Sequence, residues 1–323
     1  MPFDYKLKII AELEIIRRKE IREGAVFKIR AYNVAIAKIQ SLTKIETIED
    51  VKSLRLGEKI YAKVAEIIET GHLAAADRVR ADDKTDITSA LMNVYGIGPV
   101  KARDLVQNQH IKSIEELRER STELLNDKQR IGLRYYEDIL ERIPREEMEK
   151  HAKLIKTYMC SIWKFDIVGS FRRGMTSSGD IDVLMTLPDN IPPADQKELF
   201  AGIVATFKAI NYTEAVLAEG DKKFMGIVRL SPTDKARRLD LMLTPAAEYG
   251  YALLYFTGSD KFNIKVRARA LEMGYTMNEH TMKVAKGSNA PTPPVLKTEE
   301  EILAFLNIPF IKPIDRVENI LFA

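Results

Sequence analysis

The sequence has few of the features that mark secreted, metal-cluster or membrane proteins. Its 323 residues include one cysteine, Cys160. A single cysteine excludes a disulfide within the chain and a zinc site with several cysteines, and it suits a reducing compartment. No run of eighteen apolar residues is present, so we expect no membrane span and no membrane partner. Residues 1–22 lack the apolar core of a signal peptide, so we expect an intracellular protein.

The residues that are present predict a folded chain with a phosphate-binding end. Hydrophobic residues make up 46% and charged residues 30%, which is enough to bury a core. The net charge is +3, but residues 1–80 hold 16 Lys and Arg against 12 Asp and Glu. The cation excess therefore lies at the N-terminal end, as a module that grips phosphate requires. Many solvated helical domains carry a similar excess.

The pattern of apolar residues changes near the middle of the chain. It is helical from Tyr5 to about Ala76 and from Thr88 to about Arg142, with a polar linker expected at Arg80–Thr85. Beyond it, short apolar runs between Gly, Pro and Ser predict strands, and Gln196–Ile210 predicts a helix. Separate domains follow, the later one an α+β fold. The expected strands are Trp163–Val168, Ile181–Thr186, Gly226–Leu230 and Leu239–Leu243.

A dense group of functional residue types lies between residues 169 and 183. Asp180 and Asp182 are two positions apart, so on a strand they face the same way. Two such carboxylates repel each other unless a hard cation lies between them, and oxygen ligands favour Mg²⁺ or Mn²⁺. Asp240, on another expected strand, supplies a third carboxylate. We expect two Mg²⁺ ions, replaceable by Mn²⁺, with Asp180 and Asp182 bridging both and Asp240 on the metal at an attacking oxygen.

The residues around these carboxylates suit a triphosphate. Gly169 and Ser170 end an expected strand, where exposed amides favour an approaching phosphate. Arg173 would contribute charge, and Ser178 and Gly179 hydroxyl or amide donors, to the β and γ phosphates. Asp-x-Asp alone is more often structural than catalytic. The ordered run is far more specific, and it reads Gly169-Ser170-Phe171-Arg172-Arg173-Gly174, then Ser178-Gly179-Asp180-Ile181-Asp182-Val183.

With these motifs the chain resembles the family X DNA polymerases and, within them, is most similar to DNA polymerase beta, from near Tyr5 to the C-terminus. The resemblance implies a multidomain fold, and we expect no further protein-interaction domain. The implied parts are an all-α lyase-like domain at 1–80, a helix-hairpin-helix thumb at 81–142, an α+β nucleotidyltransferase palm at 143–248 and a small C-terminal α+β subdomain at 249–323 that binds the nascent base pair.

A helix-hairpin-helix signature runs from Val94 to Ala102. Gly96 and Gly98 permit a tight turn, and the following helix start offers amides to a DNA phosphate, with Lys101 directly after it. An ordinary glycine turn is the alternative. The resemblance also implies a Na⁺ or K⁺ ion held by carbonyls here. A first hairpin at Leu54–Lys59 has Arg55 where the family has glycine, which puts metal binding there in doubt and makes a direct phosphate contact by Arg55 a hypothesis.

A second chemistry is indicated in residues 1–80. Lys59 and Lys63 share one helix face, and Lys28 and Tyr32 share another. Clustered ammonium groups would bind a 5′-phosphate and lower the pKa of one lysine until it is a nucleophile. By resemblance, Lys63 is the Schiff-base lysine of a 5′-deoxyribose phosphate lyase, and Lys28, Tyr32 and Lys59 bind phosphate. The plainer alternative is a solvated lysine face.

The family's nascent-base-pair region is matched between residues 255 and 267. Tyr255 and Phe256 would crowd a ribose 2′-oxygen and so select dNTPs, although an aromatic pair before glycine is more often core packing. Arg238 and Arg267 would contact DNA, the latter in the template minor groove. The incoming nucleotide would be bound by Tyr255, Phe256, Gly258, Asp260 and Asn263.

Several positions depart from the family pattern. Phe27 replaces a histidine and Ala75 a lysine, which puts the lyase in doubt. Met242 replaces an arginine that pairs with a catalytic aspartate in the open form, and His280 replaces a tyrosine near the finger-closing contacts. Losing that arginine would bias the enzyme towards its metal-ready state.

The predicted function is template-directed filling of short DNA gaps in base excision repair by a monomer, with lyase activity through Lys63. The expected partners are gapped or nicked DNA with a 5′-phosphate, dNTPs and, from the pathway, a DNA ligase. The expected location is nuclear in a eukaryote or a viral replication site in a virus. Alternatives are a gap-filling polymerase without lyase activity, a non-enzymatic gapped-DNA scaffold, and a nucleotidyltransferase acting on RNA or a small molecule.

Overall fold

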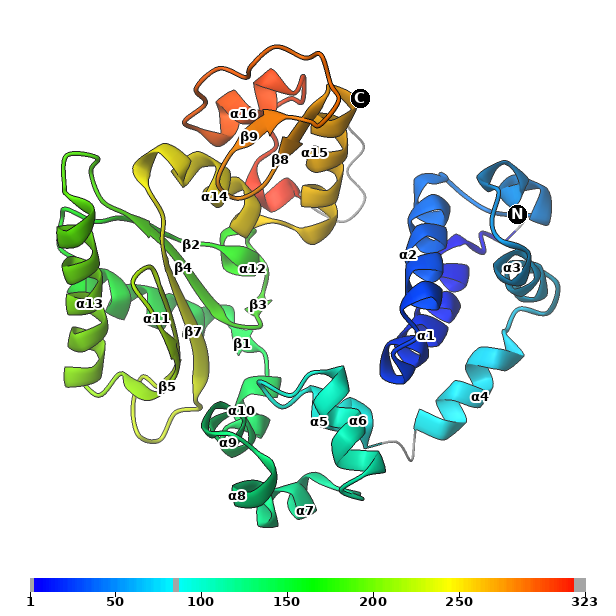
Figure 1. The fold of residues 1–323 in the computed structure, drawn as a ribbon, viewed down its shortest axis with the longest axis horizontal. Coiled ribbons are helices and arrows are strands. Elements are labelled where there is room, and N and C mark those ends of the chain that lie inside the picture. The colour runs from blue at the N-terminus through cyan, green and yellow to red at the C-terminus, as the bar shows by residue number, and fades with distance from the viewer. Residues whose placement is uncertain (1–2, 84–86, 317–323) are drawn as a thin grey trace. The chain divides into compact units, whose positions relative to one another are not determined.

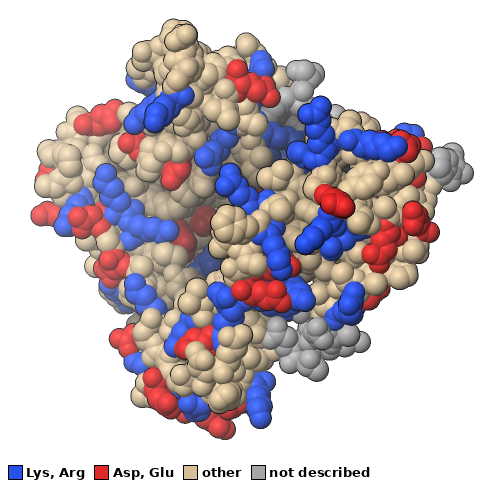
Figure 2. Space-filling model, turned by 45° about the vertical axis from the view of Figure 1, so that its right-hand side comes forward, with Lys and Arg blue, Asp and Glu red and all other residues tan. Residues whose placement is uncertain are grey.

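The computed structural model describes residues 3–83 and 87–316, and the chain divides into two units, Met1–Arg134 and Tyr135–Ala323 (Figure 1). Among the described residues, no helix is both long enough and apolar enough to cross a membrane. Figure 2 shows Lys and Arg side chains mixed with Asp and Glu over the face in view.

The first unit is helical. Apolar residues at helical spacing, such as Ile9, Leu13 and Ile16, are buried in its main core. Gly24 and Gly71 end two of the helices in left-handed conformations that glycine adopts without strain. The elements are α1 (Lys6–Glu23), α2 (Val26–Ser41), the 3-10 helix η1 (Ile48–Leu54), α3 (Glu58–Thr70), α4 (Ala74–Asp83), α5 (Thr88–Met92), α6 (Pro99–Gln107), α7 (Ile114–Glu119), α8 (Ser121–Leu124) and α9 (Asp127–Arg134).

The first four residues of the linker expected at Arg80–Thr85 are helical. α4 continues to Asp83, and residues 84–86 lie outside the described residues. Arg80 donates to Glu12 at 2.7 Å and to Asp77 at 2.6 Å, so the charged residues that suggested a linker include one that ties α4 to α1. The prediction of a linker was therefore wrong for residues 80–83.

The second unit is built on a five-stranded sheet of order β2-β4-β7-β6-β5. β4 and β7 are parallel, and the other neighbours are antiparallel. Phe200 and Phe207 of α13 belong to the same core as Val183 and Leu241 of the sheet. The strands are β1 (Ile143–Pro144), β2 (Lys164–Ile167), β3 (Ser177–Ser178), β4 (Ile181–Thr186), β5 (Thr213–Glu219), β6 (Lys223–Val228), β7 (Arg237–Leu243), β8 (Tyr275–Met277) and β9 (Met282–Val284).

Helices pack against this sheet, and others form a smaller C-terminal part with β8 and β9. A buried ionic cluster links the two parts: Glu299 accepts bonds from Arg172 at 2.6 and 3.0 Å and from Arg316 at 2.7 Å. The helices are α10 (Tyr136–Leu140), α11 (Arg145–Tyr158), α12 (Gly169–Arg172), α13 (Pro193–Ala209), η2 (Ala246–Glu248), α14 (Tyr249–Thr257), α15 (Asp260–Glu272), α16 (Glu299–Phe305) and η3 (Pro313–Asp315).

Candidate active site

Two of the three predicted carboxylates lie side by side at the centre of the sheet. Asp182 on β4 is the register partner of Asp240 on β7. Because the two strands are parallel, register partners point to the same side of the sheet. The sequence alone could not give this pairing, since 58 residues separate the two positions. The fold therefore brings together the acidic pair on which the predicted chemistry depends.

Burial makes this pair costly when both groups are ionised. Burial and the neighbouring Asp240 raise the pKa of Asp182 to about 6, and Lys223 opposes the shift. Burial also raises the pKa of Asp240, which is 8% exposed, against the pull of Arg238 and Lys223. A cationic partner would stabilise two such carboxylates.

The third carboxylate, Asp180, lies just before β4 and is bonded to Arg238. The same guanidinium is 3.7 Å from Asp240 through its Nε atom. Arg238, which we expected to contact DNA, thus balances charge within the acidic group. Within residues 3–83 and 87–316, no three His, Cys, Asp or Glu side chains come close enough together to hold a metal ion.

A cavity of about 360 Å³ opens beside the acidic pair. The turn from β2 into α12 forms part of its wall through Gly169. Gly169 has a φ of +60°, and a Cβ at this position would lie 3.0 Å from Asp182 Oδ2, so the turn and the carboxylate approach closely only with glycine here. Arg173 is fixed by a 2.6 Å bond to the carbonyl of Thr257. The lining residues are Arg142, Gly169, Ser170, Arg173, Asp180, Asp182, Tyr255, Phe256, Gly258, Asp260 and Asn263.

The cavity differs from the predicted site in a few residues. Ser178, Gly179 and Asp240 do not line it, and Ser178 pairs with Ile143 between β3 and β1. Arg142 lines it and was missed. Its guanidinium donates to the hydroxyl and to the carbonyl of Ser177, both at 2.7 Å. The only sequence signal for Arg142 was its charge beside Ile143-Pro144, since its position depends on a strand pairing formed with residue 178.

The residues predicted to select the nucleotide lie on α14 and α15. Tyr255 and Phe256 pack edge to face with ring centroids 5.2 Å apart, and both line the cavity. Asn263 donates to the carbonyl of Tyr255 at 2.7 Å, which fixes α15 against α14. Arg267 is exposed on α15. Two helices thus carry one wall of the cavity.

The turn of the predicted helix-hairpin-helix lies directly before α6. Gly96 has a φ of +83°, as a tight turn requires, and its carbonyl accepts from Gln129 at 2.9 Å. Gly98 caps α6, and a Cβ there would meet nothing within 4 Å. Lys101 pairs loosely with Asp104, at 3.5 Å. The start of α6 thus has free space at residue 98, and phosphate binding there stays a prediction.

The four residues assigned to the lyase lie on α2 and α3. Lys63 Nζ donates to the carbonyl of Lys59 at 3.4 Å. Lys28 pairs with Glu20 at 3.0 Å, and burial raises the pKa of Tyr32, which is 7% exposed. These contacts leave the lyase assignment of Lys63 a prediction.

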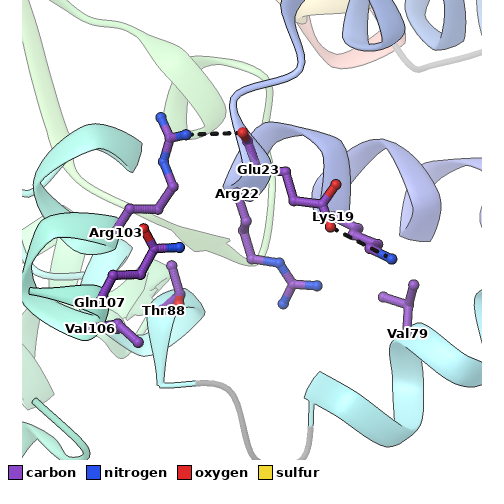
Figure 3. Close-up of a pocket in the computed structure, with 8 residues that line it drawn as sticks. All are labelled: Lys19, Arg22, Glu23, Val79, Thr88, Arg103, Val106 and Gln107. Atoms are coloured by element: carbon purple, nitrogen blue, oxygen red, sulfur yellow. Dashed lines mark hydrogen bonds and ion pairs between the residues drawn. The ribbon is translucent and has the colours of Figure 1, made fainter. Parts of the chain in front are cut away.

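A second cavity, of about 280 Å³, lies in the first unit (Figure 3). Arg103 donates to the carbonyl of Glu23 at 3.0 Å, and Gly24 leaves room for its guanidinium. Arg22 donates to Ser89 at 3.3 Å. Because these cations are engaged by the protein itself, we assign no ligand to this cavity. Its walls are Lys19, Arg22, Glu23, Val79, Thr88, Arg103, Val106 and Gln107.

Comparison with known proteins identifies three matching regions. Residues 89–140 match the fingers domain of DNA polymerase lambda, residues 142–246 the DNA polymerase beta palm, and residues 252–317 the DNA polymerase beta thumb. DNA polymerase lambda from Rattus norvegicus is 30% identical over 338 residues, covering 97% of this chain and 56% of the relative. The chain belongs to family X of the DNA polymerases.

Two further relatives extend the comparison. DNA polymerase lambda from Arabidopsis thaliana is 27% identical, covering 88% of this chain and 57% of the relative. DNA nucleotidylexotransferase from Gallus gallus is 25% identical, covering 92% and 64%. The chain thus spans less than two thirds of the length of each of these relatives. Because the matches include both beta and lambda members, the particular similarity to DNA polymerase beta remains a prediction.

The family X matches name the flanking subdomains differently from our expectation. We expected the helix-hairpin-helix region to be the thumb, whereas residues 89–140 match a fingers domain and 252–317 a thumb.

Two residues that depart from the family pattern, Met242 and His280, contact identified neighbours in the structure. Met242 packs with Leu184 and Tyr249, and His280 bonds Glu248 at 2.7 Å.

The acidic residues fit the divalent ions that family X implies. Asp182 and Asp240 are adjacent carboxylates, and Asp240 Oδ1 is buried without a hydrogen bond among the described residues. Carboxylate oxygens of this kind are the ligands that Mg²⁺ and Mn²⁺ prefer. Asp180 would join them once Arg238 releases it.

Proposed function

We propose that this protein is a template-directed DNA polymerase that fills short gaps with dNTPs. The observation that carries the proposal is the register pairing of Asp182 with Asp240, beside a cavity lined by cations and aromatic rings. The proposed reaction is attack of the primer 3′-oxygen on the α-phosphorus of the dNTP, with loss of pyrophosphate. Base excision repair is the pathway in which short gaps with 5′-phosphates arise.

Different residues of the cavity would bind the triphosphate and the sugar of the dNTP. Arg142 and Arg173 would bind the triphosphate, because each guanidinium is already fixed by a bond to a carbonyl. Ser170 and the amides of the turn before α12 would add donors, and so would Ser178 and Gly179 if the triphosphate reaches beyond the lining of the cavity. Tyr255 and Phe256 would pack against the sugar and exclude a ribose.

Asp180, Asp182 and Asp240 would hold the divalent ions, which when bound lower the pKa of the attacking hydroxyl and neutralise the triphosphate. Arg238 is the residue that must move. It engages Asp180 in the structure, and release of that carboxylate would free the arginine for the DNA backbone. Asp260, Asn263 and Arg267 would position the nucleotide and the template.

A lyase activity is the second part of the proposal. The neutral amine of Lys63 would attack the aldehyde carbon of an abasic 5′-sugar, and water would leave to give a Schiff base. Loss of a C2′ proton would then break the C3′–O bond and release the DNA with a 5′-phosphate. Lys28, Lys59 and Tyr32 would bind the phosphate. Borohydride should trap the wild type on such DNA, and undiminished trapping in Lys63→Ala would defeat the assignment.

Extension of a primer on one-nucleotide-gapped DNA tests the polymerase. With Mg²⁺ and each dNTP in turn, we expect one addition, dictated by the template base and faster with a 5′-phosphate at the gap. Parallel reactions use a primer without a template and an RNA primer–template. Additions that ignore the template would favour a terminal transferase, as the nucleotidylexotransferase relative suggests. No addition, with tight binding of gapped DNA, would favour the scaffold.

A further inference from the structure

The turn that follows η1 is held by a lysine from another helix. Lys38 on α2 donates from Nζ to the carbonyl of Leu54 at 2.8 Å and to that of Arg55 at 3.5 Å. These carbonyls lie at the C-terminal end of a 3-10 helix, where intrahelical donors run out and a cation is favoured. The ammonium group therefore acts as the counter-charge of this turn.

Arg55 has the conformation and freedom expected of a binding residue. Its φ is 45° and its ψ 55°, a left-handed geometry that costs a non-glycine residue on the order of 1 kcal/mol. Its side chain is exposed, and its guanidinium makes no hydrogen bond or ion pair within the part of the chain that the structure describes. An exposed arginine kept in a strained backbone position points to a contact with a ligand.

The surroundings of Arg55 favour an anion. A cavity of about 350 Å³ has Arg30, Lys38 and Arg55 in its wall and no acidic residue. Its remaining wall is apolar and includes Phe27, whose side chain is 91% exposed. At Gly57, the N-cap of α3, a Cβ would meet nothing within 4 Å, so access is open. A DNA phosphate is the complementary group.

We propose that Lys38 is a built-in cation for the turn at residues 54–57, which holds Arg55 towards a DNA phosphate without a bound monovalent metal ion. This inference rests on the proposed DNA-binding function. It makes Lys38 a positioning residue, because its ammonium group donates to two backbone carbonyls rather than to DNA.

The chemistry of the ammonium group supplies the test. It has the charge of K⁺ and is close to it in size, and carbonyl oxygens accept either. In Lys38→Met the side chain keeps its apolar stem but ends one atom short of the ammonium position, so it releases both carbonyls and leaves room for K⁺ beside them. A purely structural loss would not respond to the kind of salt.

Affinity for one-nucleotide-gapped DNA should be measured in KCl and in choline chloride at equal ionic strength, with EDTA present. In choline chloride we expect Lys38→Met to bind about tenfold more weakly than the wild type, the effect of one charge-assisted hydrogen bond. In KCl the difference should fall to about threefold or less. The affinity of the variant is compared with that of the wild type in the same salt, so that an effect of K⁺ at the hairpin of Gly96 and Gly98 is common to both proteins.

Thermal unfolding of the same proteins without DNA provides a second reading. Lys38→Met should be stabilised by K⁺ relative to choline more than the wild type is, and Lys44→Met, which loses an exposed ion pair with Glu46, should not. Equal effects of the two salts on Lys38→Met, in binding or in unfolding, would overturn the inference. If the wild type itself fails to bind gapped DNA, the proposed function falls, and unfolding still decides the role of Lys38.

Discussion

At the scale of single residues, the acidic pair explains both the chemistry and a cost in stability. Asp240 is buried and its neighbour Asp182 is half-buried, and both must be ionised to bind cations. Sites that place like charges together are usually destabilising in the absence of their ligand. The sequence indicated the carboxylates through their spacing and their neighbours, but their pairing arises from the parallel contact of β4 with β7.

Asp182→Asn should stabilise the protein in EDTA while abolishing nucleotide transfer. The pKa of Asp182 is raised to about 6, so its charged form disfavours folding as the pH rises through that value. Removing the charge at about pH 8 should add roughly 1–3 kcal/mol to the free energy of unfolding. Urea denaturation measures it, with the exposed Asp189→Asn as a control. An unchanged or lower stability would contradict the burial argument.

His151 gives a pH dependence of the opposite sign. It is fully buried, its Nδ1 lies 2.7 Å from the Tyr212 hydroxyl, and burial lowers its pKa to about 4. The stability that it contributes is present above about pH 6.5 and is lost as the pH falls towards 4. Between about pH 7.5 and 5 the loss should be about 2 kcal/mol. Because Asp182 opposes it, the test is the difference between wild type and His151→Gln, which should shrink with falling pH.

At the scale of elements, the predicted bounds were accurate where glycine or proline limits a run of apolar residues. Ile181–Thr186 was predicted with the bounds of β4, because Gly179 and Pro188 limit an apolar run. β5 was missed, since it is an edge strand with register shifts and an incomplete alternation of buried residues. The position of Arg142 depends on pairing of β1 with β3, and no local pattern predicts a two-residue strand.

The ionic cluster around Glu299 should be a main support of the C-terminal part. Glu299 is 3% exposed and is bonded to Arg172, the last residue of α12, and to Arg316. Glu299→Gln would leave two guanidinium groups without their counter-ion, at a cost of about 3 kcal/mol or more. Denaturant unfolding measures the loss, and the exposed neighbour Glu300→Gln serves as control. Equal stability of the two variants would show that the cluster contributes little.

At the scale of the whole molecule, the two proposed activities belong to different units. Lys63 lies in Met1–Arg134, and Asp240 lies in Tyr135–Ala323. The sequence predicted a change from helices to strands after about Arg142, whereas the two units divide between residues 134 and 135, and the family X matches lie within residues 89–317. The lyase assignment rests on the resemblance and on the spacing of the lysines. A Schiff base forms only with the substrate, so the contacts of Lys63 alone do not reveal this activity.

Separate locations predict separable losses. Lys63→Ala should lose borohydride trapping and keep gap extension, while Asp240→Asn should keep trapping and lose extension. Both assays use the full chain and the same gapped DNA. Joint loss of both activities in either variant, with normal folding by circular dichroism, would show that the two units do not act independently.

The most direct test of the account is the single-turnover rate of dNTP addition by Asp240→Asn, measured beside its affinity for gapped DNA. The account predicts a rate lower by roughly a thousandfold, since the change removes a ligand of the ions that lower the barrier. Affinity for DNA should stay within about threefold of the wild type. A rate like that of the wild type would contradict the central role of the Asp182–Asp240 pair.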